Sequence, residues 1–247
     1  MGAEAVSTIL AADDLELAAV VDPSDVAGAS GVVHVGAIGE LDADLVDVVV
    51  DFTIADVARE TIAWVARNAK DAVVGTSGLT DEDLEAARAA CSGGPSRILV
   101  VPNFSIGAVL VQRFAVQAAP YFASVEVIEL HHAAKKDAPS GTSIATTEAL
   151  ADARSRHGLG EPHDPTESTT IPGARGATGP GGIHVHSVRL PGLLAHQEVI
   201  FGGPGEGLTL RHDTYDRSSF MEGLLLALRG LSSITGVVRG LESVLDS

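Results

Sequence analysis

The sequence is poor in positive charge, and above all in lysine. Its 247 residues hold 16 Lys and Arg against 33 Asp and Glu, a net charge of −17, and only three of them are lysines. Nucleic acid and anionic membranes would be repelled by most of such a surface. We therefore expect neither as a partner, whereas a local basic pocket could still bind a small anion.

Cysteine and long apolar runs are also scarce. Cys91 is the only cysteine, which excludes an internal disulfide and a cysteine-based metal cluster and fits a reducing cytosol. No run of about 18 or more apolar residues occurs, and the N-terminus lacks the basic start and apolar stretch of a signal peptide. We predict a cytoplasmic protein, whose 45% hydrophobic residues can build a substantial core.

Apolar runs recur through the first hundred residues, and each ends in small or polar residues. The runs are 15–22, 45–53, 71–77 and 97–104, with helix-like segments at 55–69 and 80–90. A capping box of Thr80 with Asp83 is expected to open the second of these helices. Continuous apolar strands that alternate with helices are typical of a parallel sheet covered on both faces. The predicted fold class is α/β, with a doubly wound, Rossmann-like domain.

The residues that follow these strands are candidates for a binding site, because a doubly wound sheet binds its ligand beyond the carboxyl ends of the strands. They are Asp22 and residues 51–53, 75–77 and 102–104. A carboxylate that closes the second strand of a dinucleotide fold normally accepts hydrogen bonds from the adenosine ribose. Asp22 has that position, and the alternative is a solvated turn aspartate before Pro23.

The start of the chain departs from this pattern. A dinucleotide fold opens with a strand and a G-x-G-x-x-G turn that brings backbone N–H groups to the pyrophosphate. Here MGAEAVSTIL already reads as a helix, with Gly2 in the place of the last glycine. The missing strand would occupy the middle of the sheet, so we expect two unpaired strand edges. Our interpretation is a misplaced start or a truncated gene product.

The pattern changes after Phe104. Helix-like segments at 105–122 and 140–158, a strand at 124–132 and the alternating segments IHVHSVRL, HQEVIFGG and GLTLRHDT follow. Ser140 is expected near the N-cap of the second helix. Strands without intervening helices imply an antiparallel or mixed sheet, and hence a second α+β domain. We predict a dinucleotide-binding domain of residues 1–105 and 215–247 and a substrate-binding and oligomerisation domain of residues 106–214. A last helix at 218–231, with a capping box of Ser219 and Glu222, should return to the first domain.

The segment ELHHAAKKDAPSGT gathers adjacent histidines and adjacent lysines just before a helix start. Free N–H groups at a helix N-terminus bind carboxylate or phosphate, and a glycine there lets the ligand approach closely. Gly141 and Thr142 are therefore a candidate anion clamp, with Lys135 as a point charge and His131 or His132 as a titratable donor. We expect an anionic substrate that carries carboxylates.

Other interpretations of these residues stay open. The histidines could cap strand backbone, and the lysines could form a solvated turn. A metal-dependent hydrolase is a further hypothesis, since His184 and His186 share one face of a strand and could join His131 and His132. Adjacent lysines would repel a cation, so we expect no metal. Four residues have no assigned role: Lys136, His184, His186 and His212.

VIELHHAAKKDAPSGT, together with VVDFT, VVGTSG, VPNFSIGA and HQEVIFG, resembles the 4-hydroxy-tetrahydrodipicolinate reductase (dihydrodipicolinate reductase) family of diaminopimelate and lysine biosynthesis. The similarity runs from about residue 2 to the C-terminus, in the short form typical of actinobacterial members. It implies a split dinucleotide-binding domain and a substrate domain whose open sheet builds a homotetramer. It also implies that NADH or NADPH reduces a cyclic dicarboxylate, 4-hydroxy-tetrahydrodipicolinate, to tetrahydrodipicolinate with net loss of water.

The resemblance also implies residue roles. His131 matches the family's proton donor or acceptor, and Lys135 matches its catalytic lysine. His132 matches a substrate-binding histidine, while Gly141 and Thr142 match the residues that hold a substrate carboxylate. The positions that match cofactor-contacting residues are Asp22, Gly75, Thr76, Ser77, Val101, Pro102, Asn103 and Phe104.

Two departures from the family pattern bear on these expectations. Ala134 stands where a third histidine often occurs, and the glycine-rich loop survives only as Gly2. At the cofactor site, the Asp22 carboxylate would repel a 2′-phosphate and no arginine follows it, which favours NADH. Two functions remain: the reductase, and a non-catalytic remnant that binds a dicarboxylate or oligomerises.

Overall fold

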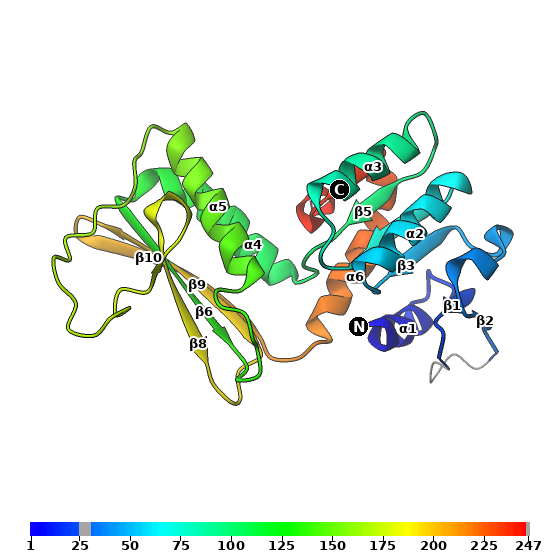
Figure 1. Cartoon of the computed structure of the whole chain (residues 1–247), viewed down its shortest axis with the longest axis horizontal. Coiled ribbons are helices and arrows are strands. Elements are labelled where there is room, and N and C mark those ends of the chain that lie inside the picture. The colour runs from blue at the N-terminus through cyan, green and yellow to red at the C-terminus, as the bar shows by residue number, and fades with distance from the viewer. Residues whose placement is uncertain (25–30, 246–247) are drawn as a thin grey trace. The chain divides into compact units, whose positions relative to one another are not determined.

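The chain forms two compact units in the computed structural model, which describes residues 1–24 and 31–245 (Figure 1). Unit 1 consists of Met1–Ile106 and Arg217–Ser247, and unit 2 consists of Gly107–Asp216. Each unit has its own hydrophobic core, as expected of a domain.

Unit 1 contains parallel strands in two separate sheets. The larger sheet has the order β11-β5-β4-β3 and consists of β3 (Val48–Asp51), β4 (Asp71–Val74), β5 (Ile98–Val100) and β11 (Val237–Arg239). The smaller sheet pairs β1 (Ala19–Val21) with β2 (Val33–Val35). Within the described residues, β1 is paired on one side only, by β2, and β3 on one side only, by β4. The predicted Rossmann-like fold and its two unpaired strand edges are both confirmed.

The helices of unit 1 are α1 (Gly2–Ala11), α2 (Ala55–Arg67), α3 (Asp81–Cys91) and α6 (Ser219–Gly230). Short 3-10 turns occur at Ile38–Glu40, Ala43–Leu45, Leu231–Ser233 and Leu241–Val244. Val21 of β1 and Val35 of β2 pack on the same core as Ile62 of α2 and Val74 of β4. Burial of this shared apolar surface therefore holds the two sheets in one unit.

Two helix starts were predicted from capping residues, with different outcomes. At α3 the capping box is confirmed: Thr80 Oγ1 accepts the Asp83 N–H at 3.2 Å, and Asp83 Oδ2 accepts the Thr80 N–H at 2.8 Å. At α6 the prediction was wrong, because Ser219 is already the first helical residue. Ser218 precedes it with φ −58° and ψ −24° and makes no side-chain capping bond, whereas a capping residue has extended backbone.

Unit 2 is a mixed sheet with helices on one face, as predicted. Its strand order is β10-β9-β6-β8-β7, and only the β6–β8 pair among these strands is parallel. The strands are β6 (Ser124–His131), β7 (Ala177–Thr178), β8 (His184–Arg189), β9 (Ala195–Gly203) and β10 (Glu206–Thr214). The helices are α4 (Ile106–Ala118) and α5 (Gly141–Arg156), and 3-10 turns occur at Ala119–Tyr121 and Pro180–Gly182.

The helix-covered face of this sheet is apolar over most of its area. The sheet contributes Val127 of β6 together with Val199 and Phe201 of β9. These side chains pack against Val111 of α4 and Leu150 of α5. Figure 1 shows both helices alongside the sheet. Because side chains alternate along a strand, every second residue of β6 and β8 faces these helices and the others face the open side.

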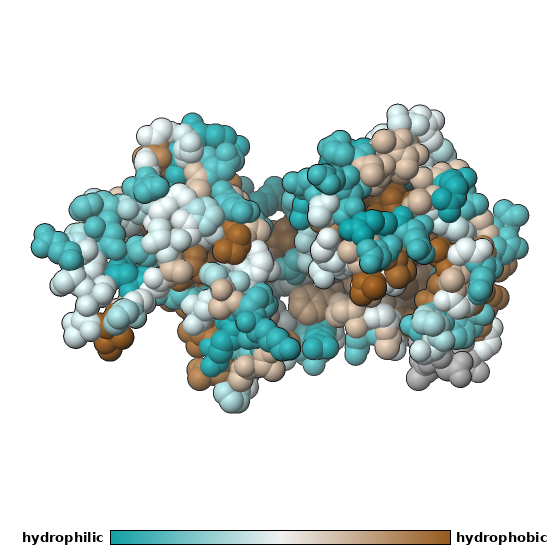
Figure 2. Space-filling view, viewed as in Figure 1, coloured by the Kyte–Doolittle hydropathy of each residue, from teal (hydrophilic) through white to brown (hydrophobic). Residues whose placement is uncertain are grey.

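The surface agrees with the acidic composition. Figure 2 shows mostly hydrophilic side chains on the viewed face, with apolar ones in small patches. Among the residues that the structure describes, no helix has the length and apolar character needed to cross a bilayer.

Candidate active site

The helix-covered face of the unit 2 sheet changes from apolar to polar at one row of residues. Val127 of β6 is fully buried, and Glu129, the next residue on that face, is also 0% exposed. Its cross-strand neighbours are Ser187 of β8 and Gln197 of β9, and Gln197 is opposite His212 of β10. A buried carboxylate is tolerated only where it is paired. This row therefore marks the end of the core and the base of a polar site.

Three side chains donate hydrogen bonds to Glu129. Arg189 of β8 binds it in a bidentate pair, with Nη1 at 2.8 Å from Oε2 and Nη2 at 2.7 Å from Oε1. His131 Nδ1 and the Ser187 hydroxyl also bond to the carboxylate. Burial raises the pKa of Glu129, but the bonds from Arg189, Ser187 and His131 outweigh it and hold the pKa below its usual value. The carboxyl group is therefore ionised although it is buried.

His131 is the last residue of β6, and its side chain is 14% exposed. Burial lowers its pKa, and the positive charges of Lys135 and Arg189 act in the same direction. The Glu129 carboxylate opposes this, yet the pKa of His131 stays below its ordinary value. The imidazole is therefore mainly neutral at neutral pH without a ligand.

The structure separates the two adjacent lysines. The Lys135 side chain is 21% exposed and its Nζ donates to Asp137 Oδ1 at 2.8 Å, whereas Lys136 is exposed. Arg189 Nη2 donates to the Asp137 carbonyl oxygen at 2.7 Å. The loop that carries Lys135 is thus fastened to β8, and its ammonium lies close enough to act on the His131 ring.

A second polar network fastens the start of α5 to β9. Ser140 is the N-cap, and its Oγ accepts the Ser143 N–H at 3.2 Å, as predicted for that position. Ser143 Oγ donates to Gln197 Oε1 at 2.9 Å, and Gln197 Nε2 donates to Thr146 Oγ1 at 3.0 Å. All four residues are buried. The first turn of α5 therefore has a fixed position on the sheet.

This first turn has the features of the predicted anion clamp. The N–H groups of Gly141 and Thr142 have no acceptor within the helix, because they belong to its first turn. A Cβ added at Gly141 would meet no protein atom within 4 Å. The space beside these N–H groups is therefore open to a ligand.

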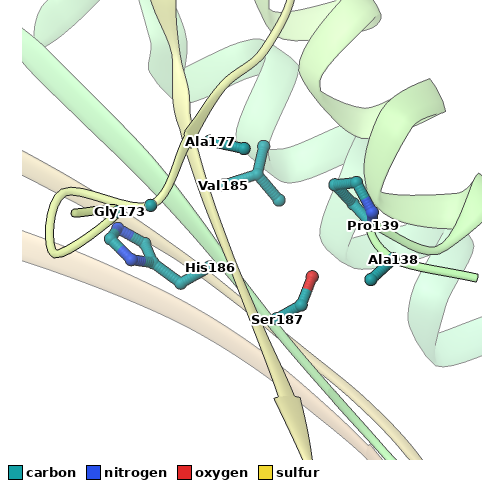
Figure 3. Close-up of a pocket in the computed structure, with 8 residues that line it drawn as sticks. Ala138, Pro139, Gly173, Ala177, Val185, His186 and Ser187 are labelled. Carbon is teal, nitrogen blue, oxygen red and sulfur yellow. The ribbon is translucent and has the colours of Figure 1, made fainter.

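A pocket opens beside the loop, next to β8 (Figure 3). It is lined by Ala138, Pro139, Gly173, Gly176, Ala177, Val185, His186 and Ser187. Figure 3 shows the Ser187 hydroxyl and the His186 ring on opposite sides of the strand. Ser187 thus lies on the side of Glu129, and His186 lies on the open face.

The four-histidine metal site is not formed. His186 Nε2 lies 2.8 Å from Glu126 Oε2, and His184 Nε2 lies 3.1 Å from Asp164 Oδ2. Both rings are on the open face of the sheet, opposite to that of His131. The hydrolase hypothesis built on these histidines was wrong for that reason.

His212 lies on the helix-covered face, packed against the start of α4. A Cβ added at Gly107 would come within 2.3 Å of its ring. Burial lowers the pKa of His212. Its environment is that of a partly buried neutral ring beside Gln197, its partner across the strand pair β9–β10.

In unit 1 the structure brings together the ends of β3, β4 and β5. The Gly75 N–H donates to the Asp51 carbonyl oxygen at 2.8 Å, and Thr76 Oγ1 donates to the buried Asp51 carboxylate. The Phe52 and Phe104 rings lie 5.3 Å apart, and a Cβ on Gly75 would come within 2.4 Å of Phe52 and 2.6 Å of Phe104. These two rings therefore require a glycine at position 75.

The remaining candidate cofactor residues differ in exposure. Ser77 and Pro102 are exposed, whereas the side chains of Thr76, Val101 and Phe104 are buried, so these three can reach a ligand mainly through backbone atoms. Asn103 Oδ1 accepts the Ser105 N–H at 2.9 Å. Asp22 follows β1 and is half-buried, and its Oδ1 accepts the Ser24 N–H at 2.8 Å.

Comparison with known proteins decides the family. The model for the dihydrodipicolinate reductase N-terminus matches residues 1–104, and that for the C-terminus matches residues 107–245. The chain belongs to the dihydrodipicolinate reductase family. The predicted resemblance is confirmed.

Relatives in this family match along nearly the whole chain. The 4-hydroxy-tetrahydrodipicolinate reductase of Synechococcus elongatus is 46% identical over 99% of this chain and 94% of its own length. That of Mycolicibacterium smegmatis is 47% identical over 100% of this chain and 95% of its own length. This coverage supports the reductase and not the non-catalytic remnant.

Solved structures agree with the family. The dipicolinate-bound dihydrodipicolinate reductase from Paenisporosarcina sp. TG-14 is 40% identical, with a TM-score of 0.89 over 98% of this chain and 94% of that one. An amine dehydrogenase from Mycobacterium smegmatis, 12% identical with a TM-score of 0.62 over 95% of this chain and 90% of that one, shares the fold alone.

The sequence analysis did not identify Ser143, Arg189 and Gln197 as residues of the candidate site, and it gave Glu129 no role. Glu129 was quoted in the motif without a task. The alternation of buried and partly exposed residues along β6 could have identified Glu129, because it places this residue on the same face as the buried valines. Arg189 carries no such local signal, since it meets Glu129 only through strand pairing.

Proposed function

We propose that the protein is a cytoplasmic NADH- or NADPH-dependent reductase that converts 4-hydroxy-tetrahydrodipicolinate to tetrahydrodipicolinate in diaminopimelate and lysine biosynthesis. The observation that carries this proposal is the cluster around the end of β6. There Glu129 fastens His131 to the sheet, and Gln197 fastens the open first turn of α5. The loop that carries Lys135 is held by the bond from Arg189 to the Asp137 carbonyl oxygen. The same cluster supplies the charges that a cyclic dicarboxylate requires.

The residues of the chain perform two tasks in this reaction: they bind the carboxylates and they transfer a proton. The N–H groups of Gly141 and Thr142 bind one carboxylate, and Lys135 with His132 neutralises the remaining negative charge. His131 holds and transfers a proton at Nε2, the ring nitrogen that Glu129 leaves free. Bound NADH or NADPH supplies the hydride.

The unit 1 residues fit such a cofactor. Asp22 offers a half-buried carboxylate at the carboxyl end of a parallel strand, where it would bind the adenosine ribose hydroxyls. The backbone of residues 75–77 and 101–104 would face the nicotinamide half. Asp22 supports a preference for NADH, because its charge would repel the 2′-phosphate of NADPH.

The open face of the unit 2 sheet supports the homotetramer. It presents apolar side chains from neighbouring strands, among them the exposed Ile200 of β9, between ion pairs such as Arg211 with Glu198. A second copy of the chain could cover this face. Sedimentation equilibrium tests it: a tetramer mass is expected, and a monomer at all concentrations would refute this part of the proposal.

The proposed activity can be assayed directly. The purified protein is mixed with 4-hydroxy-tetrahydrodipicolinate, and the loss of NADH or NADPH absorbance is followed. We expect substrate-dependent oxidation of at least one cofactor. No turnover by a folded protein with either cofactor would overturn the proposed function.

A further inference from the structure

A fully buried acid stands directly behind the proton-transfer histidine. Glu129 and His131 are two residues apart on β6, so both side chains project to the helix-covered face. The Glu129 carboxylate bonds to His131 Nδ1, the ring nitrogen on the protein side. The carboxylate therefore contacts the ring from the side opposite to Nε2.

We propose that Glu129, held by Arg189, is a positioning residue that fixes the ring orientation and the Nδ1–H tautomer of His131 and stabilises that ring when it carries a second proton. The inference rests on the proposed function, since it assigns the task of proton transfer to His131. Glu129 itself touches neither substrate nor cofactor in this scheme.

The tautomer follows from hydrogen-bond chemistry. An ionised carboxylate has no proton to give and can only accept. His131 Nδ1 must therefore be the protonated nitrogen of the neutral ring, which leaves the Nε2 lone pair directed away from Glu129. Nε2 can then take a proton and deliver it to a substrate, while a ring of the opposite tautomer could not.

Arg189 keeps the carboxylate in place for this task. Its two Nη atoms bind the two oxygens of Glu129 at 2.8 and 2.7 Å, and Nη2 also reaches the Asp137 carbonyl at 2.7 Å. The Ser187 hydroxyl adds a further donor. A carboxylate held from several sides cannot rotate away, so the ring that bonds to it has one orientation.

The charges that face His131 explain why Glu129 is needed. Glu129, on the same strand, contributes a negative charge. Lys135 of the loop and Arg189 of β8 contribute positive charges. Ala195, opposite His131 on β9, and Gly141 at the start of α5 carry no charge. Lys135, itself paired with Asp137, and Arg189 thus oppose protonation of the ring, while Glu129 favours it and a negatively charged substrate would favour it further.

The chain contains a matched control for this arrangement. Glu126 lies on the same strand but on the open face, and it also bonds to an arginine and a histidine: Arg175 Nη2 at 2.6 Å and His186 Nε2 at 2.8 Å. Glu126→Gln therefore makes the same chemical change in a similar pair, away from His131. Glu129→Gln removes the charge at nearly constant volume and replaces one acceptor oxygen with an NH2 group, which cannot accept the hydrogen bond that Arg189 Nη2 donates to Oε1.

The experiment combines spectroscopy and kinetics. The full-length protein is labelled with ring ¹⁵N-histidine, the His131 signals are assigned with His131→Gln, and NMR reports the tautomer and pKa of that ring in wild type, Glu129→Gln and Glu126→Gln. The same three proteins are assayed for kcat and KM across pH. Isothermal titration with dipicolinate, a stable planar dicarboxylate, and thermal unfolding serve as measures of binding and folding.

We expect wild-type His131 to be the Nδ1–H tautomer. In Glu129→Gln its pKa should fall by about 1 unit or more. The kcat at neutral pH should drop on the order of 10- to 100-fold and recover in part as the pH is lowered. The Kd for dipicolinate should change less than about 3-fold, because Glu129 does not contact the ligand. Glu126→Gln should match wild type in the pH profile.

Two results would overturn the inference. One is an Nε2–H tautomer in wild type, which decides the question even if Glu129→Gln does not fold. The other is an unchanged His131 pKa in a folded Glu129→Gln variant whose activity is reduced equally at every pH, as expected of a purely structural residue. Failure of the proposed function gives a different result, since wild type would then lack turnover while the NMR measurement still reports the Glu129–His131 bond.

Discussion

Ser143 of α5 donates its hydroxyl hydrogen to Gln197 Oε1 of β9 at 2.9 Å, with both side chains buried. This bond links the first turn of α5, proposed to bind the anion, to the sheet that carries His131. The proposed clamp of Gly141 and Thr142 thus depends on a glutamine that lies on another strand.

Replacing Gln197 by Met should weaken the clamp. The variant keeps the side-chain length but removes one hydrogen bond each from Ser143 Oγ and Thr146 Oγ1, at a cost of about 0.5–1.5 kcal/mol per bond. The two hydroxyls keep their bonds to Ser140 Oγ and to the Thr142 carbonyl oxygen. We expect a lower melting temperature and a Kd for dipicolinate raised on the order of 10-fold, measured by calorimetry. Gln117→Met, at an exposed position of α4, is the control and should leave both unchanged. A wild-type Kd in a folded Gln197→Met protein would show that the link is not needed.

Stability should fall as the pH drops below about 6.5, the ordinary histidine pKa. Burial lowers the pKa of His131 and of His212, so the folded state favours the neutral rings. This contribution is complete above the unfolded pKa of about 6.5 and is lost as the pH falls through the lower folded pKa.

The melting temperature, measured from pH 8 to pH 5, tests this linkage. Histidines titrate in this range, whereas carboxylates ordinarily titrate below it. His212→Gln should reduce the slope between about pH 6.5 and 5. His163→Gln, at an exposed position, should not. An identical slope in all three proteins would argue against the buried neutral rings.

Asp22 should set cofactor preference. In wild type we expect a higher kcat/KM with NADH than with NADPH, because the carboxylate repels a 2′-phosphate. Asp22→Ser should shift the ratio towards NADPH on the order of 10-fold. Asp13→Ser, an exposed change elsewhere in unit 1, is the comparison. A clear NADPH preference in wild type would contradict the role of Asp22.

The sequence predicted elements well where the deciding interactions are local. The capping box of Thr80 with Asp83 and the N-cap Ser140 each involve residues at most three positions apart. The unpaired edges of β1 and β3 were also predictable, because residues 2–11 read as a helix where a dinucleotide fold has its central strand. The error at Ser219 arose because the preceding residue, Ser218, already has helical backbone angles, so the helix begins without an extended capping residue.

Elements that depend on distant pairing were missed. β11 has three residues and exists because it pairs with β5, more than a hundred positions earlier. The link between Glu129 and Arg189 spans 60 positions, and the strand register that creates it is set by the whole sheet. The motif therefore identified His131 and Lys135, while the residues that hold them required the structure.

The central claim is that the cluster at the end of β6 binds a dicarboxylate and supplies the proton for its reduction. Substitution of the two adjacent lysines tests this claim most directly. Lys135→Ala and Lys136→Ala make the same change at a partly buried and at an exposed position. With 4-hydroxy-tetrahydrodipicolinate and NADH, we predict that kcat/KM falls on the order of 10²-fold or more for Lys135→Ala and less than about 3-fold for Lys136→Ala, with both proteins folded. Equal activity of Lys135→Ala and wild type would contradict the account.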